Sequence, residues 1–204
     1  MHCNLASVEA RVLVQPTMYP PKLIKPYVVS FCRSIVRDPT PRFVPVRSRP
    51  DAEVRSCFTT VARQVRESGG QMSTGWAIWE WPDVIIEGEY HCVWLSPSGD
   101  EIDITPKDPA IKRILFLPDA VRPYGGFQRD NFRKVLCNDK DVLRMAELGR
   151  LIHEELNRGE LKHQHGEVVV RIQYARYQEE NAAIVARLAK RYGHRLAELA
   201  KHSV

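Results

Sequence analysis

Residues 84–106 read VIIEGEYHCVWLSPSGDEIDITP, and this stretch predicts a β-hairpin. Val84–Ser96 is rich in β-branched and aromatic residues, and Glu101–Thr105 is a shorter run in which polar and apolar residues alternate. Pro97–Gly99 lies between the two runs, and a three-residue loop with Gly at its last position is a common hairpin connection. The stretch therefore predicts two antiparallel strands joined by a tight turn.

The expected register brings an imidazole and a carboxylate together. A three-residue loop makes Ser96 face Asp100 and Val93 face Asp103, and His91 lies two residues from Val93 on the same face. His91 and Asp103 are then diagonal cross-strand neighbours, so that Asp103 can hold one imidazole nitrogen and leave the other free. A two-residue loop would instead place these two side chains on opposite faces.

A cysteine precedes this hairpin at the start of a predicted helix. Gly69 and Gly70 end the helix, and either Asp51 or Ser56 caps it. With Ser56 as the cap, Cys57 lies in the first turn, where the helix dipole and unpaired N–H groups stabilise a thiolate or an oxyanion. With Asp51 as the cap this benefit shrinks. Whichever residue caps the helix, a small buried hydrophobe is the alternative reading of Cys57, and the helix alone favours that reading. Helical spacing is carried by Val54, Phe58, Val61 and Val65.

These motifs resemble those of a known group of enzymes, the transglutaminase-like branch of the papain-type cysteine enzymes. The resemblance covers about Arg47 to Pro106, under a third of the chain. It is carried by a cysteine at a helix start, His-x-x-Trp on a strand, a Gly turn and Asp-x-Thr-Pro, here Cys57, His91, Trp94, Asp103, Thr105 and Pro106.

The resemblance implies a nucleophile helix packed on a small antiparallel sheet. It also implies that Cys57 is the nucleophile, His91 the general base and acid, and Asp103 the residue that orients the imidazole. The chain departs from the family in two places: Phe58 follows the cysteine where Trp is typical nearby, and no Gln shortly precedes Cys57 to complete a papain-type oxyanion hole.

Aromatic and acidic residues near this segment are candidates for substrate binding. Trp76, Trp79 and Trp81 can form an aromatic wall near the thiol, although ordinary strand packing explains them equally well. Glu87 and Glu89 share the face of His91, where either can replace Asp103 as its partner or favour cationic substrates. We take Trp76, Trp79 and Glu89 as the candidate substrate-binding residues.

Composition limits the remaining possibilities. The chain has 204 residues, enough for one good core, and it lacks an apolar run that would span a membrane. Its five cysteines are scattered, form no Cys-x-x-Cys motif and predict no disulfide framework. Together with the lack of a secretory signal this favours a cytoplasmic protein, or one delivered by a signal-free route. The lack of a Gly-rich phosphate loop makes an NTP-dependent enzyme unexpected.

Charge and proline mark the N-terminal segment. Residues 1–50 carry eight Lys or Arg and two acidic residues, a net charge of +6. We expect residues 1–46 to form a basic, Pro-rich arm, within which Tyr27–Val36 docks on the core as a helix or strand and Arg42–Arg47 forms a strand. Because no nucleic-acid motif accompanies the arm, solvated charge is favoured over nucleic-acid binding.

Residues 138–204 are expected to be helical. Asn138 or Asp139 caps a first helix that Gly159 ends, and a second helix runs from about Tyr174 to Ala200. The stretch 167–172 is either a short strand or the beginning of that second helix. A helical hairpin of this kind packs on the core, binds a partner or forms a dimer contact.

Metal chemistry is not favoured. His163 and His165 in a polar loop, with His153 one helix earlier, are more often solvated than bound to a metal. A site formed by Cys57, His91 and Cys92 is disfavoured because neighbouring strand residues point to opposite faces. We therefore expect neither a metal nor a cofactor.

The sequence thus predicts an α+β protein with a papain/transglutaminase-like core over 47–137, flanked by the arm (1–46) and by the helical region (138–204). The function that best fits is a thiol-dependent hydrolase or acyltransferase acting on a protein or peptide amide. The alternatives are a non-enzymatic protein that binds partners through its C-terminal helices and a nucleic-acid-associated protein that uses its basic arm.

Overall fold

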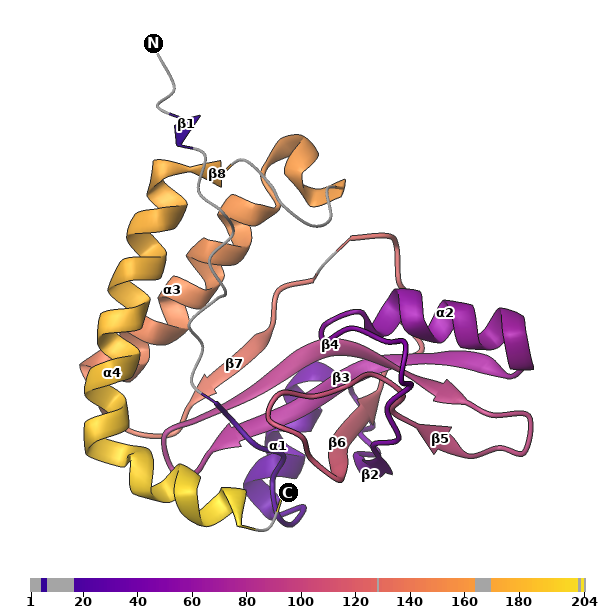
Figure 1. The fold of residues 1–204 in the computed structure, drawn as a ribbon. Helices are drawn as coiled ribbons and strands as arrows, with labels where there is room; N and C mark the ends of the chain where they lie inside the picture. Colours follow the sequence, from indigo (N-terminus) through magenta and orange to yellow (C-terminus); the bar gives the residue numbers. More distant parts are fainter. Residues whose placement is uncertain (1–4, 7–16, 128, 164–169, 202, 204) are drawn as a thin grey trace.

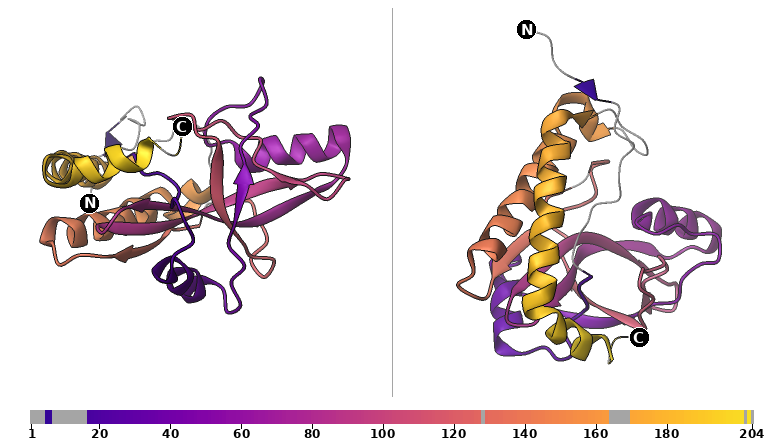
Figure 2. Two further views of the ribbon diagram at one scale, coloured as in Figure 1. Left: turned by 90° about the horizontal axis from the view of Figure 1, so that it is seen from below. Right: turned by 60° about the vertical axis from the view of Figure 1, so that its left-hand side comes forward.

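A computed structural model describes residues 5–6, 17–127, 129–163, 170–201 and 203. In these residues the chain is a mixed α+β protein with four α-helices, a six-stranded sheet and a separate two-stranded ladder. Helices α3 and α4 stand at one end of the large sheet and α2 at the other, as two views agree (Figure 1, Figure 2).

The large sheet has the order β2-β6-β3-β4-β5, and β7 also pairs with β4. All of its ladders are antiparallel. Its strands are β2 (Arg42–Pro45), β3 (Gln71–Trp81), β4 (Ile85–Leu95), β5 (Glu101–Ile102), β6 (Arg113–Pro118) and β7 (Phe132–Val135).

The two ends of this strand order meet. An isolated parallel bridge joins Val46, just after β2, to Asp103, just after β5. The N–H of Asp103 donates to the carbonyl of Pro45 (3.0 Å), and the N–H of Arg47 donates to the carbonyl of Asp103 (2.9 Å). The sheet therefore closes on itself, and the strong curvature of its strands is visible in Figure 2 (right).

The predicted hairpin register is confirmed. Trp94 lies opposite Ile102 in the β4–β5 ladder, and the N–H of Ser96 donates to the carbonyl of Asp100 (2.9 Å) around the three-residue loop. Gly99 takes a φ of 92°, in the left-handed region that glycine tolerates best. The loop chemistry thus sets the alignment on which the relation between the imidazole and the carboxylate depends.

Helix α2 begins where the Ser56 alternative predicts. Helix α2 spans Cys57–Ser68 with Ser56 at the N-cap position, while Asp51 is bound by Arg49 at 2.9 Å and lies outside the helix. The helix packs on the outer face of β4, where Val61 is fully buried. A helix packed on an antiparallel sheet is therefore present.

Helix α1 (Pro26–Ile35) covers another part of the outer face. Its apolar side chains bury Trp76 of β3 and Ile86 of β4 in one cluster. Helix α1 therefore contributes to the core. Strand β2 belongs to the large sheet, because it pairs with β6. The described part of segment 1–46 is thus not a separate arm, and the boundary at 46 cuts through the sheet; the expected elements at 27–36 and 42–47 are both present.

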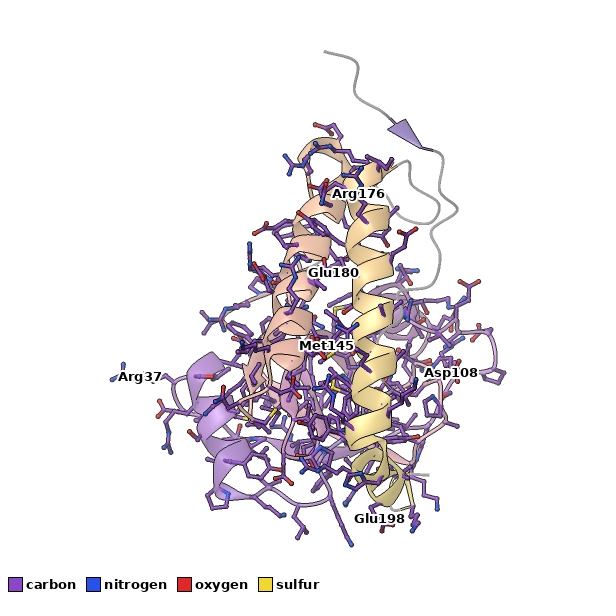
Figure 3. The ribbon with its side chains drawn as sticks, turned by 90° about the vertical axis from the view of Figure 1, so that its left-hand side faces the viewer. Arg37, Asp108, Met145, Arg176, Glu180 and Glu198 are labelled. Carbon is purple, nitrogen blue, oxygen red and sulfur yellow. The ribbon has the colours of Figure 1, made fainter. Side chains whose placement is uncertain are left out.

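The C-terminal region forms the expected helical pair. Helix α3 (Lys140–Leu156) is capped by Asp139, whose side chain accepts from the N–H of Asp141 (2.9 Å). Helix α4 (Ile172–Ala200) lies beside it (Figure 3). Arg144 binds Glu180 across the pair at 2.7 Å. Both helices pack on Trp81 and Ile85 of the β3–β4 ribbon.

The remaining elements are short. A 3₁₀ helix spans Gly159–His163, and β1 (Leu5–Ala6) pairs antiparallel with β8 (Val170–Arg171). Of the stretch 167–172, residues 167–169 lie outside the described residues, whereas Val170–Arg171 is a strand and Ile172 begins α4. Within the described ranges, even the 29-residue α4 lacks the apolar length needed to cross a bilayer, and so does every other helix.

Candidate functional site

Cys57 is the first residue of α2 and is 8% exposed. The chain turns into the helix through Arg55, whose φ of 67° is uncommon for a non-glycine residue. The Ser56 hydroxyl donates to the carbonyl of Glu53 (2.6 Å) and meets the Thr60 hydroxyl at 2.8 Å. These contacts fix the first turn, so that the thiol lies at the positive end of the helix dipole.

His91 and Asp103 form a buried pair, as the hairpin predicts. The imidazole Nε2 lies 2.9 Å from Asp103 Oδ2, and the two residues are 4% and 0% exposed. The other carboxylate oxygen, Oδ1, accepts from the N–H of Thr105 at 3.0 Å. Because Nε2 is occupied by Asp103, Nδ1 is the imidazole nitrogen left for another partner.

An interruption at one edge of β4 makes room for the thiol. On this edge β7 pairs with residues 85–88 and β5 with residues 94–95, so neither ladder includes residues 89–93. Cys57 packs against Cys92 and Ile104 within this region. The thiol therefore lies at the edge of the strand, where residues from both of its faces reach it.

The electrostatics of Cys57 favour a thiolate. Hydrogen bonding with Cys92 has the largest effect and lowers the pKa of the Cys57 thiol well below its usual range, while burial opposes it. The charge of His91 and a hydrogen bond with its side chain lower that pKa further. Burial and the same hydrogen bond raise the pKa of Cys92, so Cys92 stays a thiol and serves as the donor.

His91 is correspondingly held as an imidazolium. Burial acts to lower its pKa, but the charges of Asp103 and Cys57 outweigh it and raise the pKa to about 10. For Asp103, burial acts to raise the pKa, whereas His91 and then Lys107 lower it to about 2. A thiolate, an imidazolium and a carboxylate thus lie in sequence, as an activated cysteine nucleophile requires.

Aromatic residues surround the thiol on the side of the β6–β7 connection. Phe58, which follows Cys57, stacks on Tyr124 with ring centroids 3.8 Å apart, and it lies 5.3 Å from the Tyr90 ring. Burial and then the charge of Cys57 raise the pKa of Tyr124. The aromatic rings near the Cys57 thiol therefore belong to residues other than the tryptophans singled out in the sequence.

The three candidate substrate-binding residues lie in two different places. Trp79 and Glu89 lie on the His91 face and bind one another, with the indole Nε1 2.8 Å from Glu89 Oε2. Trp76 lies on the opposite face, 1% exposed, with its Nε1 donating to Asp119 Oδ2 at 3.0 Å. Because β3 residues alternate between faces, Trp76 packs under α1 and presents no surface to a substrate.

Glu87 does not replace Asp103 as the partner of His91. Its carboxylate binds Arg133 (2.8 Å) and Asn131 (3.1 Å), and burial raises its pKa. It lines a cavity of about 120 Å³ between the sheet and α3, which His153 also lines. Within this cavity Arg133 pairs with both Glu87 and Asp130, which is typical of a structural network.

In the described part of the chain, no three His, Cys, Asp or Glu side chains are grouped so as to hold a metal ion. Cys92 does point to the opposite face from His91, but both act on Cys57 because the thiol lies at the strand edge. Of the other metal candidate, His165 and the side chain of His163 lie outside the described part of the chain.

The roles of three residues of the site were not predicted from the sequence. Lys107 binds Asp103 Oδ2 at 2.6 Å, Cys92 acts on the thiol, and Tyr124 comes from a connection of no evident pattern. Lys107 directly follows the Asp-x-Thr-Pro motif, and this proximity was the only sequence signal that pointed to its contact with Asp103.

Comparison of the chain with protein-family models, curated proteins and solved structures found no match. What supports a function is therefore the arrangement of Cys57, His91 and Asp103 and the charges around them.

Proposed function

We propose that this protein is a thiol-dependent amide hydrolase or acyltransferase of the transglutaminase-like type. The observation that carries the proposal is that Cys57, at the beginning of α2, lies within reach of the charge and the hydrogen bond of His91, whose Nε2 is held by buried Asp103 at 2.9 Å. This order of thiol, imidazole and carboxylate is the arrangement by which cysteine nucleophiles are activated.

In the first step the Cys57 thiolate attacks the carbonyl carbon of an amide. The resulting oxyanion is stabilised by the backbone N–H of Cys57 and the positive end of the α2 dipole. His91, protonated and held by Asp103, then donates a proton to the leaving nitrogen as the C–N bond breaks. The products of this step are a free amine or ammonia and a thioester on Cys57.

In the second step His91, now neutral, accepts a proton from the incoming nucleophile. Water as the nucleophile completes hydrolysis or deamidation, whereas a primary amine completes an acyl transfer. Both outcomes regenerate the Cys57 thiolate and the His91 imidazolium. The chemistry needs no metal and no cofactor, because the thiolate and the imidazolium supply the nucleophile and the acid.

Trp79 and Glu89 are proposed to contact the substrate beside the reacting amide. Glu89 is two residues from His91 on the same strand face, about 7 Å along β4. Its carboxylate is only partly buried and is oriented by the Trp79 indole. A protein or peptide amide with a nearby positive charge fits this side of the site.

The order of the elements also supports the transglutaminase-like assignment. A helix begins with the cysteine, the histidine follows on a long central strand, and the aspartate follows directly after the next strand along the chain. Phe58 takes a position where the family typically has Trp nearby, and Tyr124 stacks on it. We propose that this aromatic pair forms the wall beside the thiol.

The thioester intermediate provides the test. The protein is incubated with a mixture of Gln-containing peptides and a fluorescent primary amine, ammonia release is followed, and acyl adducts are located by peptide mass. We expect an adduct on Cys57 that is absent in Cys57→Ala and that accumulates in the absence of amine.

The control for this experiment is Cys137→Ala, which removes a half-buried thiol that lies against Val84 of a different cluster. It should leave adduct formation unchanged. Failure to find any acyl adduct on Cys57, across peptide amides of varied sequence, would count against the proposal.

A further inference from the structure

Asp103 binds two cationic groups through one oxygen. Its Oδ2 lies 2.9 Å from His91 Nε2 and 2.6 Å from Lys107 Nζ. The carboxylate is fully buried and the Lys107 side chain is only 13% exposed. Lys107 also donates to the carbonyl of Thr105 at 3.0 Å, which fixes the position of the ammonium.

The proposed active form of the triad has a net negative charge that Lys107 can offset. A thiolate, an imidazolium and a carboxylate sum to a net charge of −1, and an uncompensated charge in a buried site is costly. The ammonium of Lys107 brings the sum to zero. The four groups then alternate in sign along the chain of contacts: Cys57, His91, Asp103 and Lys107.

We propose that Lys107 is a positioning residue of the triad, whose ammonium offsets the net negative charge of the thiolate–imidazolium–carboxylate arrangement and so keeps all three groups ionised together. This inference rests on the proposed function. Lys107 acts through Asp103 and is not itself expected to touch the substrate.

The other groups around the triad do not supply this positive charge. Cys92 is held as a neutral thiol, and the hydroxyl of Tyr124 has a raised pKa. The titratable groups that face the triad come from α2, β4, the segment after β5 and the β6–β7 connection, and they are Cys57, His91, Cys92, Asp103, Lys107 and Tyr124.

The sign of the effect is definite. A positive charge near a titrating site makes each proton easier to lose, so its removal raises the pKa of both Cys57 and His91. In Lys107→Met the pH at which Cys57 becomes reactive should therefore rise by about one unit. Lys107→Arg keeps the charge and should restore the wild-type profile.

The experiment measures the rate of iodoacetamide alkylation at Cys57 between about pH 4 and 9 in wild type, Lys107→Met, Lys107→Arg and Lys112→Met. Lys112 is an exposed lysine near the same segment, and its replacement controls for loss of a surface charge. If Lys107→Met does not fold, Lys107→Gln is measured in its place, since it keeps a donor for Asp103 without the charge.

Two negative results are distinguishable. A wild-type Cys57 that alkylates with the pH dependence of an ordinary thiol would overturn the proposed function, and this inference with it. A wild-type Cys57 with a low apparent pKa that stays unchanged in folded Lys107→Met or Lys107→Gln would overturn this inference alone. A merely structural role would lower the yield of folded protein without moving the profile.

Discussion

Replacement of Asp103 by Asn is expected to weaken the stabilisation of the thiolate by the imidazolium while keeping a side chain of the same shape at position 103. Asn has the shape of Asp and can still bind His91 Nε2, but it carries no charge. Both Asp103 and His91 are buried, so the lost charge is not replaced by solvent. Asp103→Asn therefore isolates the electrostatic contribution of the carboxylate.

The size of the effect follows from the geometry. With unit charges about 4 Å apart and an effective dielectric constant of about 20, the interaction is worth about 4 kcal/mol. At about 1.4 kcal/mol per pKa unit, this lowers the pKa of His91 by about 3 units. The wild-type value of about 10 would fall to near neutrality, and the balance between thiolate–imidazolium and thiol–imidazole would shift toward the neutral pair.

The assay is alkylation of Cys57 by iodoacetamide at pH 6, read out by peptide mass. We expect a decrease in rate of about tenfold in Asp103→Asn, because the neutral thiol–imidazole pair gains population at the expense of the reactive thiolate. Glu87→Gln is the matched control: it removes a buried carboxylate from the same face of β4, four residues from His91, and leaves Arg133 with Asp130 as its ion-pair partner.

Glu87→Gln should lower the stability of the protein about as much as Asp103→Asn does, but it should keep the wild-type alkylation rate at Cys57. The reasoning would be refuted if Asp103→Asn retained native circular dichroism and alkylated Cys57 with the wild-type pH profile. Asp103 would then be a structural residue that joins β5 to β2 and Lys107.

Three other substitutions test separate parts of the site. Cys92→Ala should raise the apparent pKa of Cys57 by about one unit in the same alkylation assay, because it removes the hydrogen bond with the largest effect on the thiolate; an unchanged pKa would count against that bond. Trp76→Phe should lower the free energy of unfolding in urea by about 1–2 kcal/mol, through its lost bond to Asp119, and leave alkylation at Cys57 unchanged; a slower rate would place Trp76 in the site after all. Glu89→Gln should keep the rate with neutral iodoacetamide but reduce the relative rate with a cationic thiol reagent by about threefold, and equal rates with both reagents would remove its role in charge selection.

Local signals were sufficient for the elements that carry the site. The loop Pro97–Gly99 set the hairpin register, so the contact between His91 and Asp103 was predictable from the sequence. Likewise, the two cap alternatives for α2 both followed from local chemistry. Only the structure decides between them, because the Arg49 side chain binds Asp51 and leaves Ser56 to begin the helix.

Non-local contacts were not predictable in this way. Closure of the sheet depends on hydrogen bonds between β2 and Asp103, residues nearly sixty positions apart, and no short pattern encodes such a pairing. The basic and Pro-rich character of 1–46 therefore suggested an arm, although its described part supplies a strand and a helix to the core.

The environment of the thiol was missed for a related reason. Strand alternation correctly places His91 and Cys92 on opposite faces, but it does not reveal that Cys57 lies at an edge that both can reach. Alternation also places Trp76 and Trp79 on opposite faces of β3, but it does not tell which of the two faces is covered by α1. Trp79 lies on the His91 face, and Trp76 packs under α1.

The central claim is that Cys57 is a thiolate activated by His91, and the most direct test is the pH dependence of iodoacetamide alkylation at each cysteine, in wild type and in His91→Ala. The account predicts fast labelling of wild-type Cys57 with an apparent pKa well below the free-thiol value of about 8.5, and loss of this behaviour in His91→Ala. Labelling of Cys57 in the folded wild-type protein that is no faster than labelling of Cys137 would contradict the account and mark Cys57 as a buried structural thiol.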